Sequence, residues 1–194
     1  MQDVVKSSLT KLPEKIVAYA PTMIGRVVDG MQITLARDAH LPNISYCALL
    51  VKLGAADIAR EFTAHLDHVL TGAVVPQQDS SFSTTITSLP LELLSADGPD
   101  PSVQALRASS DLFDTVAAKA KVLGIKDFRI YGKKLFLAAL RQGFTKARID
   151  EENIARLLPY ACSALDTELV TLYGRFETML GKIQSATASS KGRA

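Results

Sequence analysis

The residues with the clearest capacity for chemistry in this 194-residue chain are the cations of a segment that runs from Lys119 to Arg148. Nine Lys and Arg side chains lie there against a single acid, Asp127, so this segment carries a net charge of +8. The whole chain has a formal charge of only +2, which makes the remainder acidic. A surface of this kind attracts anionic partners such as acidic proteins or nucleic-acid phosphates.

A helix over residues 127–142 would give this segment two different faces. Its core face holds Phe128, Tyr131, Leu135, Ala138 and Ala139 when the residues are projected at helical spacing. The opposite face mixes cations with Ile130, Phe136, Leu137 and Leu140, so we expect it to bury a second surface against a partner. The predicted partner- or phosphate-binding residues are Lys126, Arg129, Lys133, Lys134, Arg141, Lys146 and Arg148. The alternative is a solvated face paired with Glu151, Glu152, Asp166 and Glu168 of the following helix.

A second constellation contains histidines. Glu61, His65 and His68 project into a narrow arc of one helix, with Asp57 beside them. Two imidazoles and a carboxylate can bind zinc or iron, so a helical metalloprotein is one alternative function. We favour a hydrated helix flank with Glu–His pairs, because the second half of the chain contains no histidine to complete a four-helix metal centre. No cofactor or metal is predicted.

Motifs for covalent or nucleotide chemistry are absent from the sequence. It has no Gly-x-Ser-x-Gly elbow, no phosphate-binding loop and no dinucleotide-binding glycine pattern. Cys47 and Cys162 lie in apolar runs, which is typical of buried, inert thiols in a reducing compartment. A non-catalytic function is therefore favoured over an enzyme.

The elements that would position these residues are helices. In the first half, prolines at 13 and 21 suit first turns and predict short helices near 2–11, 13–19 and 21–38. After a break at 41–43, an apolar run over 44–53 ends at Gly54, a plausible C-terminal cap, and a further helix covers 55–70.

The second half has clearer helix boundaries. Asp100 and Pro101 predict the start of a helix that ends at Gly124, and a helix over 127–142 ends at Gly143. Asp150 caps a last helix over 151–184, which Pro159 should kink or restart.

Together these elements predict an all-α fold: a multi-helix bundle of mostly antiparallel helices, with a long kinked C-terminal helix and a Ser/Thr/Pro-rich central loop. We divide the chain into a helical half at 1–75, a linker or long loop at 76–100, a second helical half at 101–184 and a disordered tail at 185–194. The linker is assigned from composition, because seven of the ten residues from Asp79 to Ser88 are Ser or Thr.

Apolar patterning also bears on the expected cellular location of the protein. No apolar run reaches the roughly 18 residues of a membrane span, and no signal peptide is recognisable, so we expect a cytoplasmic protein. The predicted function is a non-catalytic interaction, adaptor or assembly protein that uses the 126–148 surface, the long C-terminal helix or both. An acidic protein partner or self-association is favoured. The alternatives are a nucleic-acid-associated regulator that uses the same cations and a metalloprotein that uses Glu61, His65 and His68.

Overall fold

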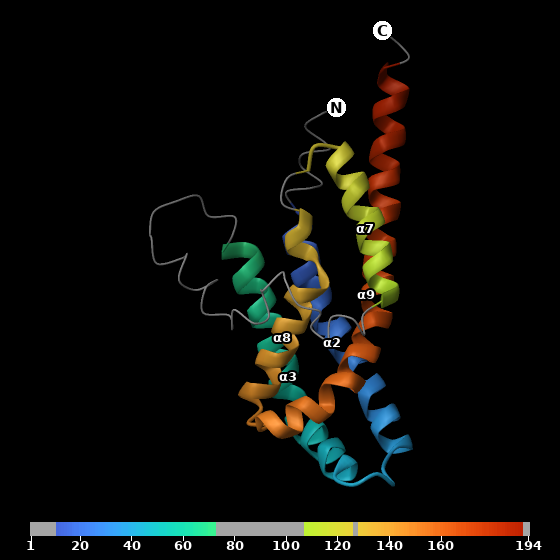
Figure 1. Cartoon of the computed structure of the whole chain (residues 1–194). Helices are drawn as coiled ribbons and strands as arrows, with labels where there is room; N and C mark the ends of the chain where they lie inside the picture. The colour runs from blue at the N-terminus through green and yellow to red at the C-terminus, as the bar shows by residue number, and fades with distance from the viewer. Residues whose placement is uncertain (1–10, 73–106, 126–127, 192–194) are drawn as a thin grey trace.

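The computed structural model describes residues 11–72, 107–125 and 128–191, with side chains up to 185. Within these ranges the chain forms helices that pack on one another, without a strand, and this confirms the predicted all-α bundle (Figure 1). The predicted helix at 2–11 and the Ser/Thr/Pro-rich loop at 76–100 lie outside the described residues.

The first half is a helical hairpin of α2 (Leu12–Arg37) and α3 (Ile44–Gly72). The predicted break between them is confirmed, and Asn43 adopts a φ of 65° there. The predicted separation of two helices at Pro21 is wrong, because α2 continues through this exposed proline. Ala20 and Met23 on either side of it are fully buried. Their packing compensates for the hydrogen bond that a proline removes from the helix.

Gly54 does not end a helix either, since α3 runs through it. This glycine is buried, and a Cβ atom there would lie 2.9 Å from the Cβ of Ala147, just beyond α8 (Lys133–Lys146). Gly143 was also expected to follow a helix and instead lies inside α8, where a Cβ would lie 2.9 Å from the carbonyl oxygen of Ile58. Both glycines therefore serve close approach of two helices rather than helix termination.

The second half holds α7 (Arg107–Val122), the 3-10 turn η1 (Phe128–Tyr131), α8 and α9 (Glu151–Lys191). Its predicted caps are confirmed where they are described. Gly124 has a φ of 73°, and the following N–H of Ile125 donates to Ala120 O at 3.0 Å. The Asp150 carboxylate accepts from the Asn153 N–H at 2.9 Å, which caps α9 and holds the pKa of Asp150 below its usual range. The predicted start at Asp100 lies outside the described residues.

The single helix expected over 127–142 is in fact two elements. Gly132 separates η1 from α8 and packs tightly, because a Cβ there would lie 3.2 Å from Arg129 O and 3.4 Å from the Phe113 ring. The break changes the helical phase between Phe128 and Leu135. The predicted core-face residues beyond Gly132, Ala138 and Ala139, are nevertheless buried, and Leu135 packs against the core.

The last helix is the longest described. α9 continues through Pro159, so no new helix starts there, and it extends to Lys191. The predicted start of the tail at 185 consequently falls inside α9. Figure 1 shows the first turns of α9 crossing the lower end of the molecule, while the remainder rises along its right side. A kink at Pro159 itself stays a prediction.

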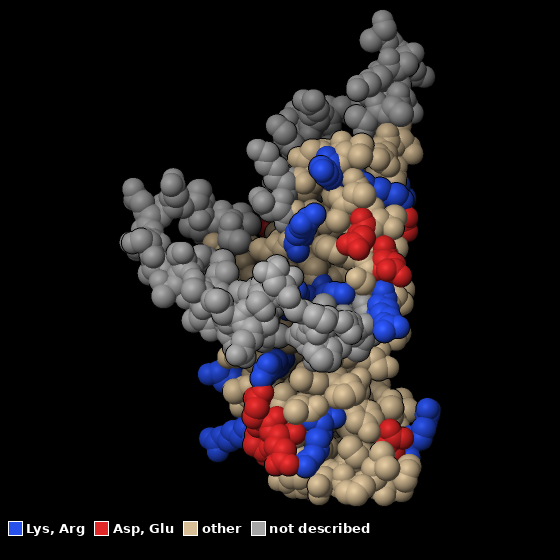
Figure 2. Space-filling model, in the orientation of Figure 1, with Lys and Arg blue, Asp and Glu red and all other residues tan. Residues whose placement is uncertain are grey.

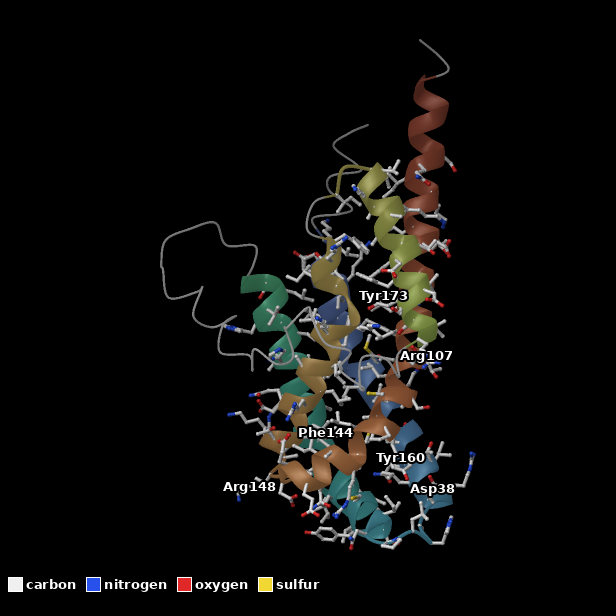
Figure 3. All side chains as sticks on the ribbon, in the orientation of Figure 1. Asp38, Arg107, Phe144, Arg148, Tyr160 and Tyr173 are labelled. Atoms are coloured by element: carbon white, nitrogen blue, oxygen red, sulfur yellow. The ribbon has the colours of Figure 1, made fainter. Side chains whose placement is uncertain are left out.

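Contacts define the helix directions. Between α2 and α9 the contacting positions move in opposite directions along the chain, from Asp38 with Tyr160 to Tyr19 with Glu168. The two helices are therefore antiparallel, and Figure 3 shows Asp38 and Tyr160 meeting near the lower end of the molecule. α7 and α9 run in the same direction instead, because Ser109 contacts Asp166 and Lys119 contacts Glu177. The predicted, mostly antiparallel arrangement has this parallel pair as an exception.

One apolar core unites the two halves of the chain. Its fully buried side chains include Ile16 and Phe62 from the first half and Phe136, Phe144 and Leu165 from the second. In Figure 3, Phe144 lies among the ribbons of the lower part. Residues on both sides of the predicted linker thus fold against each other.

Candidate partner-binding groove

The predicted basic surface of residues 126–148 is partly neutralised by neighbouring groups. Arg141 forms an ion pair with Glu151, as expected for a face paired with the next helix. The Lys133 ammonium donates to the Ser110 hydroxyl at 3.0 Å. Four other predicted cations, Arg129, Lys134, Lys146 and Arg148, are exposed, and Lys126 lies outside the described residues.

The apolar part of that predicted surface is wrong. Phe136, Leu137 and Leu140 were expected among the outer cations, but all three are at most 1% exposed and belong to the core. The error arises because α8 is buried on both projected faces: it packs on α3 and also contacts α9, and the five residues from Phe136 to Leu140 are all buried. Ile130 alone of the four predicted apolar residues is exposed, at 36%. The exposed cations of α8 therefore lack the adjoining apolar surface that a partner would bury.

Charges of both signs cover one face of the molecule. Figure 2 shows Lys and Arg spread along its length, with Asp and Glu in several groups beside them. Interspersed charges of this kind screen one another and produce no strong field of one sign.

The histidines of the predicted metal constellation are not gathered with other ligands within the part of the chain that the structure describes. Among the described residues, no group of three or more His, Cys, Asp or Glu side chains could hold a metal ion. Glu61 instead accepts a hydrogen bond from Arg60 at 3.2 Å, and Arg60 also pairs with Asp57 at 2.7 Å. Burial lowers the pKa of His65, and the neighbouring His68 lowers it further. Its Nε2 atom is buried and has no hydrogen-bond partner in the described structure.

The cysteines are buried, as predicted. The Cys47 thiol lies 3.4 Å from the Asn153 Oδ1 atom, to which it donates. Burial raises the pKa of this thiol, which favours its neutral form over the reactive thiolate.

A groove between the first turns of α2 and the second half of α9 combines shape with charge. It has a volume of about 570 Å³. Its lining consists of three cations, two threonines and three apolar or small residues: Lys15, Arg175 and Lys182; Thr171 and Thr178; and Gly174, Met179 and Ile183. All three cations are exposed. The described residues that line the groove include no carboxylate, so these walls carry charge of one sign.

Local helix chemistry explains why the groove stays open. The hydroxyls of Thr171 and Thr178 bond back to the carbonyls of Thr167 and Gly174, four residues earlier in α9, at 3.2 and 2.9 Å. Gly174 contributes no side chain, and a Cβ there would meet nothing within 4 Å. The floor therefore has open space at Gly174, and the two threonine hydroxyls already donate to backbone carbonyls.

Arg175 is held in place by the helix opposite. Its guanidinium lies 4.6 Å from the centre of the Tyr19 ring, and the Tyr19 hydroxyl donates to Glu168 at 3.0 Å. Burial and the Glu168 carboxylate raise the pKa of Tyr19. Arg26 completes the cluster, 3.6 Å from Glu168. The carboxylate beside the groove thus interacts with Tyr19 and Arg26.

The three groove cations are not paired with carboxylates of the described structure. No ion pair within 4 Å joins any of them to a described Asp or Glu. Sequence reasoning missed this site because Lys15 and Lys182 lie at opposite ends of the chain. Arg175 and Lys182, seven residues apart on one helix, were the only local signal, and the nearby Met179 and Ile183 looked like core residues.

The fold and this groove together define the protein as an all-α bundle with an open, basic groove on its longest described helix. Comparison with protein-family models, curated proteins and solved structures finds no match to the chain. Among the described residues, none of the helices combines the length and the apolar composition that a membrane span requires.

Proposed function

We propose that this protein is a non-catalytic interaction protein that binds an acidic segment of a protein partner in the α2–α9 groove. The observation that carries the proposal is the set of three cations, Lys15, Arg175 and Lys182, around one groove with no carboxylate among its described lining residues. Of the two surfaces expected from the sequence, the long C-terminal helix is favoured over the 126–148 surface, since three of the four apolar residues expected on the latter are buried.

The size and composition of the groove support binding. Its volume of about 570 Å³ lies within the range of roughly 300 to 1,000 Å³ that is common for ligand sites. Met179 and Ile183 are only half-buried and add apolar surface between the cations. A partner that supplies carboxylates together with apolar side chains would match both features.

Two other functions are less well supported by this lining. Non-specific binding of single-stranded nucleic acid uses aromatic side chains on which bases stack, and the groove lining contains none. The ring of Tyr19, beside the groove, is already stacked against the guanidinium of Arg175. Catalysis most often uses histidine, cysteine or carboxylate groups, and none of these lines the groove either.

Fluorescence anisotropy tests the proposal. Labelled probes are a short amphipathic peptide of Glu, Ala and Leu and, separately, single-stranded and duplex oligonucleotides, in about 50 and about 200 mM salt. The key variant is Lys15→Glu/Lys182→Glu, since both side chains are exposed and neither stacks on Tyr19. The matched control, Lys134→Glu/Lys146→Glu, makes the same change in charge at exposed positions of α8.

We expect the wild type and the α8 variant to bind the peptide, and the groove variant to bind it at least about tenfold more weakly. Loss of binding in the α8 variant alone would move the site to the 126–148 surface. Binding of oligonucleotides but not of peptide would favour the nucleic-acid regulator. Absence of any binding by the wild type would overturn the proposal.

A further inference from the structure

We infer that the partner segment binds as an α-helix that presents two carboxylates seven residues apart, rather than as an extended chain. This inference rests on the proposed function and specifies the partner of the same groove. It follows from the spacing of the groove cations and from the form of the floor between them.

The two cations on α9 define a fixed spacing. Arg175 and Lys182 are separated by seven residues of one helix, which is two turns, so both lie on nearly the same side of α9. Their Cα atoms are therefore about 10.5 Å apart along the helix axis, at about 1.5 Å per residue. A single small anion cannot contact both side chains at once without bending them together.

A partner helix reproduces that spacing and an extended chain does not. Carboxylates at positions i and i+7 of a helix lie on one face, again about 10.5 Å apart. In an extended chain the same distance corresponds to about three residues, at about 3.3 Å each. Side chains three residues apart in a strand point to opposite faces, so only one of them could reach the α9 edge of the groove.

The remainder of the lining fits a helix laid along α9. Lining residues extend from Thr171 to Ile183, a rise of about 18 Å or three turns. Met179 offers an apolar contact between the two cations and Ile183 another just beyond Lys182, while Gly174 leaves space for a side chain of the partner. Lys15, on the opposite wall, would contact a third carboxylate on the other flank of the partner helix. This is the helix-in-groove mode of recognition, with a basic rim.

Three labelled peptides of identical composition test the inference. The first is a helix former with Glu at i and i+7 and Leu at i+3. The second moves one Glu to i+5, on the opposite face of a helix. The third places its two Glu at alternate positions, i and i+2, which share one face of an extended chain but not one face of a helix. We expect the first peptide to bind about fivefold more tightly than either of the others, the equivalent of one lost ion pair. Circular dichroism should show that it gains helix on binding.

A groove-filling variant tests the location without altering charge. Gly174→Leu fills the floor and, because Leu has a higher helix propensity than Gly, should not unfold α9. Gly25→Leu is the matched control, since Gly25 is an exposed position of α2 whose Cβ would also meet nothing within 4 Å. We expect Gly174→Leu to weaken binding of the first peptide about tenfold and Gly25→Leu to leave it unchanged.

The outcomes separate the inference from the proposed function. Equal binding of all three peptides, lost in Lys15→Glu/Lys182→Glu, would overturn the helical spacing and leave an acidic partner in place. Preference for the alternating peptide would show an extended partner. Binding that survives both Gly174→Leu and Lys15→Glu/Lys182→Glu would overturn the inference and the proposed function together.

Discussion

The α3–α8 contact and the α2–α9 contact differ in the size of the side chains that lie between the two helices. Gly54 and Gly143 let α3 and α8 approach until a Cβ on either glycine would lie 2.9 Å from an atom of the other side. Ile58 and Phe144, which lie nearby in this contact, are fully buried. The close approach excludes water and leaves no room for a ligand.

Small residues close the α2–α9 contact only in its middle. Gly30 there lies close to Ala164, with 3.3 Å between its would-be Cβ and the Cβ of Ala164. Towards the upper end, long polar side chains replace small ones: Tyr19 and Arg26 meet Glu168, and Arg175 stacks on Tyr19. Beyond them, Lys15 of α2 and residues of α9 from Arg175 to Ile183 line the basic groove. The comparison shows that the size of the side chains between two helices decides where the helices pack tightly and where a groove remains.

The largest expected effect on stability comes from a substitution in the tightly packed α3–α8 contact. We expect Gly143→Ala to lower the free energy of unfolding by about 2 to 3 kcal/mol, because the new Cβ would overlap the Ile58 carbonyl, which cannot move without separating the helices. Urea denaturation measures this change. The matched substitution Gly25→Ala, at an open and exposed helix position, should instead raise stability by about 1 kcal/mol. Equal effects at the two glycines would contradict the role of close approach.

The second expected effect on stability concerns Glu168, in the polar part of the α2–α9 contact. Glu168 is 8% exposed and accepts the Tyr19 hydroxyl. Glu168→Ala should cost about 1 to 2 kcal/mol, since it leaves this hydroxyl without a described acceptor. Glu168→Gln retains an acceptor and should cost less. Thermal unfolding of both variants measures the two losses of stability. If the losses are equal, the effect belongs to the ion pair between Glu168 and Arg26 instead.

Local features were predictable from the sequence, because their causes lie within a few residues. Asp150 caps the helix that follows it, and Gly124 adopts the positive φ that ends the helix before it. The amphipathic spacing of the final helix likewise follows from its own residues. These signals were sufficient for an all-α bundle.

Features that depend on distant residues were not predictable. Gly54 looks like a helix terminator until its contact with Ala147, more than 90 positions later, is known. The density of cations in 119–148 suggested a binding surface, but the sequence does not show that Arg141 pairs with Glu151 or that Phe136 is buried. The groove needs Lys15 beside Lys182, and only the antiparallel register of α2 and α9 brings them together.

A smaller effect lies at the end of α8. Arg148 has a φ of 60° and Gly124 a φ of 73°, and each is followed by the same type of hydrogen bond, from Ile149 to Phe144 and from Ile125 to Ala120. Arg148→Gly should therefore raise stability by about 0.5 kcal/mol through relief of backbone strain, whereas Gly124→Ala should lower it by about 1 kcal/mol. Figure 3 places Arg148 at the outer edge of the molecule. Chemical denaturation measures both changes, and a weaker binding of acidic peptide by Arg148→Gly would restore a role for the basic end of α8.

The smallest expected effect is a change in the pH dependence of stability, and it concerns a histidine of α3. His65 lies on α3, the helix of the sealed contact, and burial lowers its pKa, with a further contribution from His68. Below the unfolded-state pKa of about 6.5, the unfolded chain binds a proton more readily than the folded one. The contribution of His65 is therefore fully present above that pH and is lost as the pH falls through the lowered folded pKa. We expect His65→Leu to reduce the loss of stability between neutral and mildly acidic pH, measured by urea denaturation at a series of pH values. His40→Leu is the control, since His40 is exposed. If His65→Leu leaves the pH dependence of the free energy of unfolding unchanged, the Nε2 atom of His65 is hydrated in solution. Water would then reach α3 more readily than its glycine contacts imply.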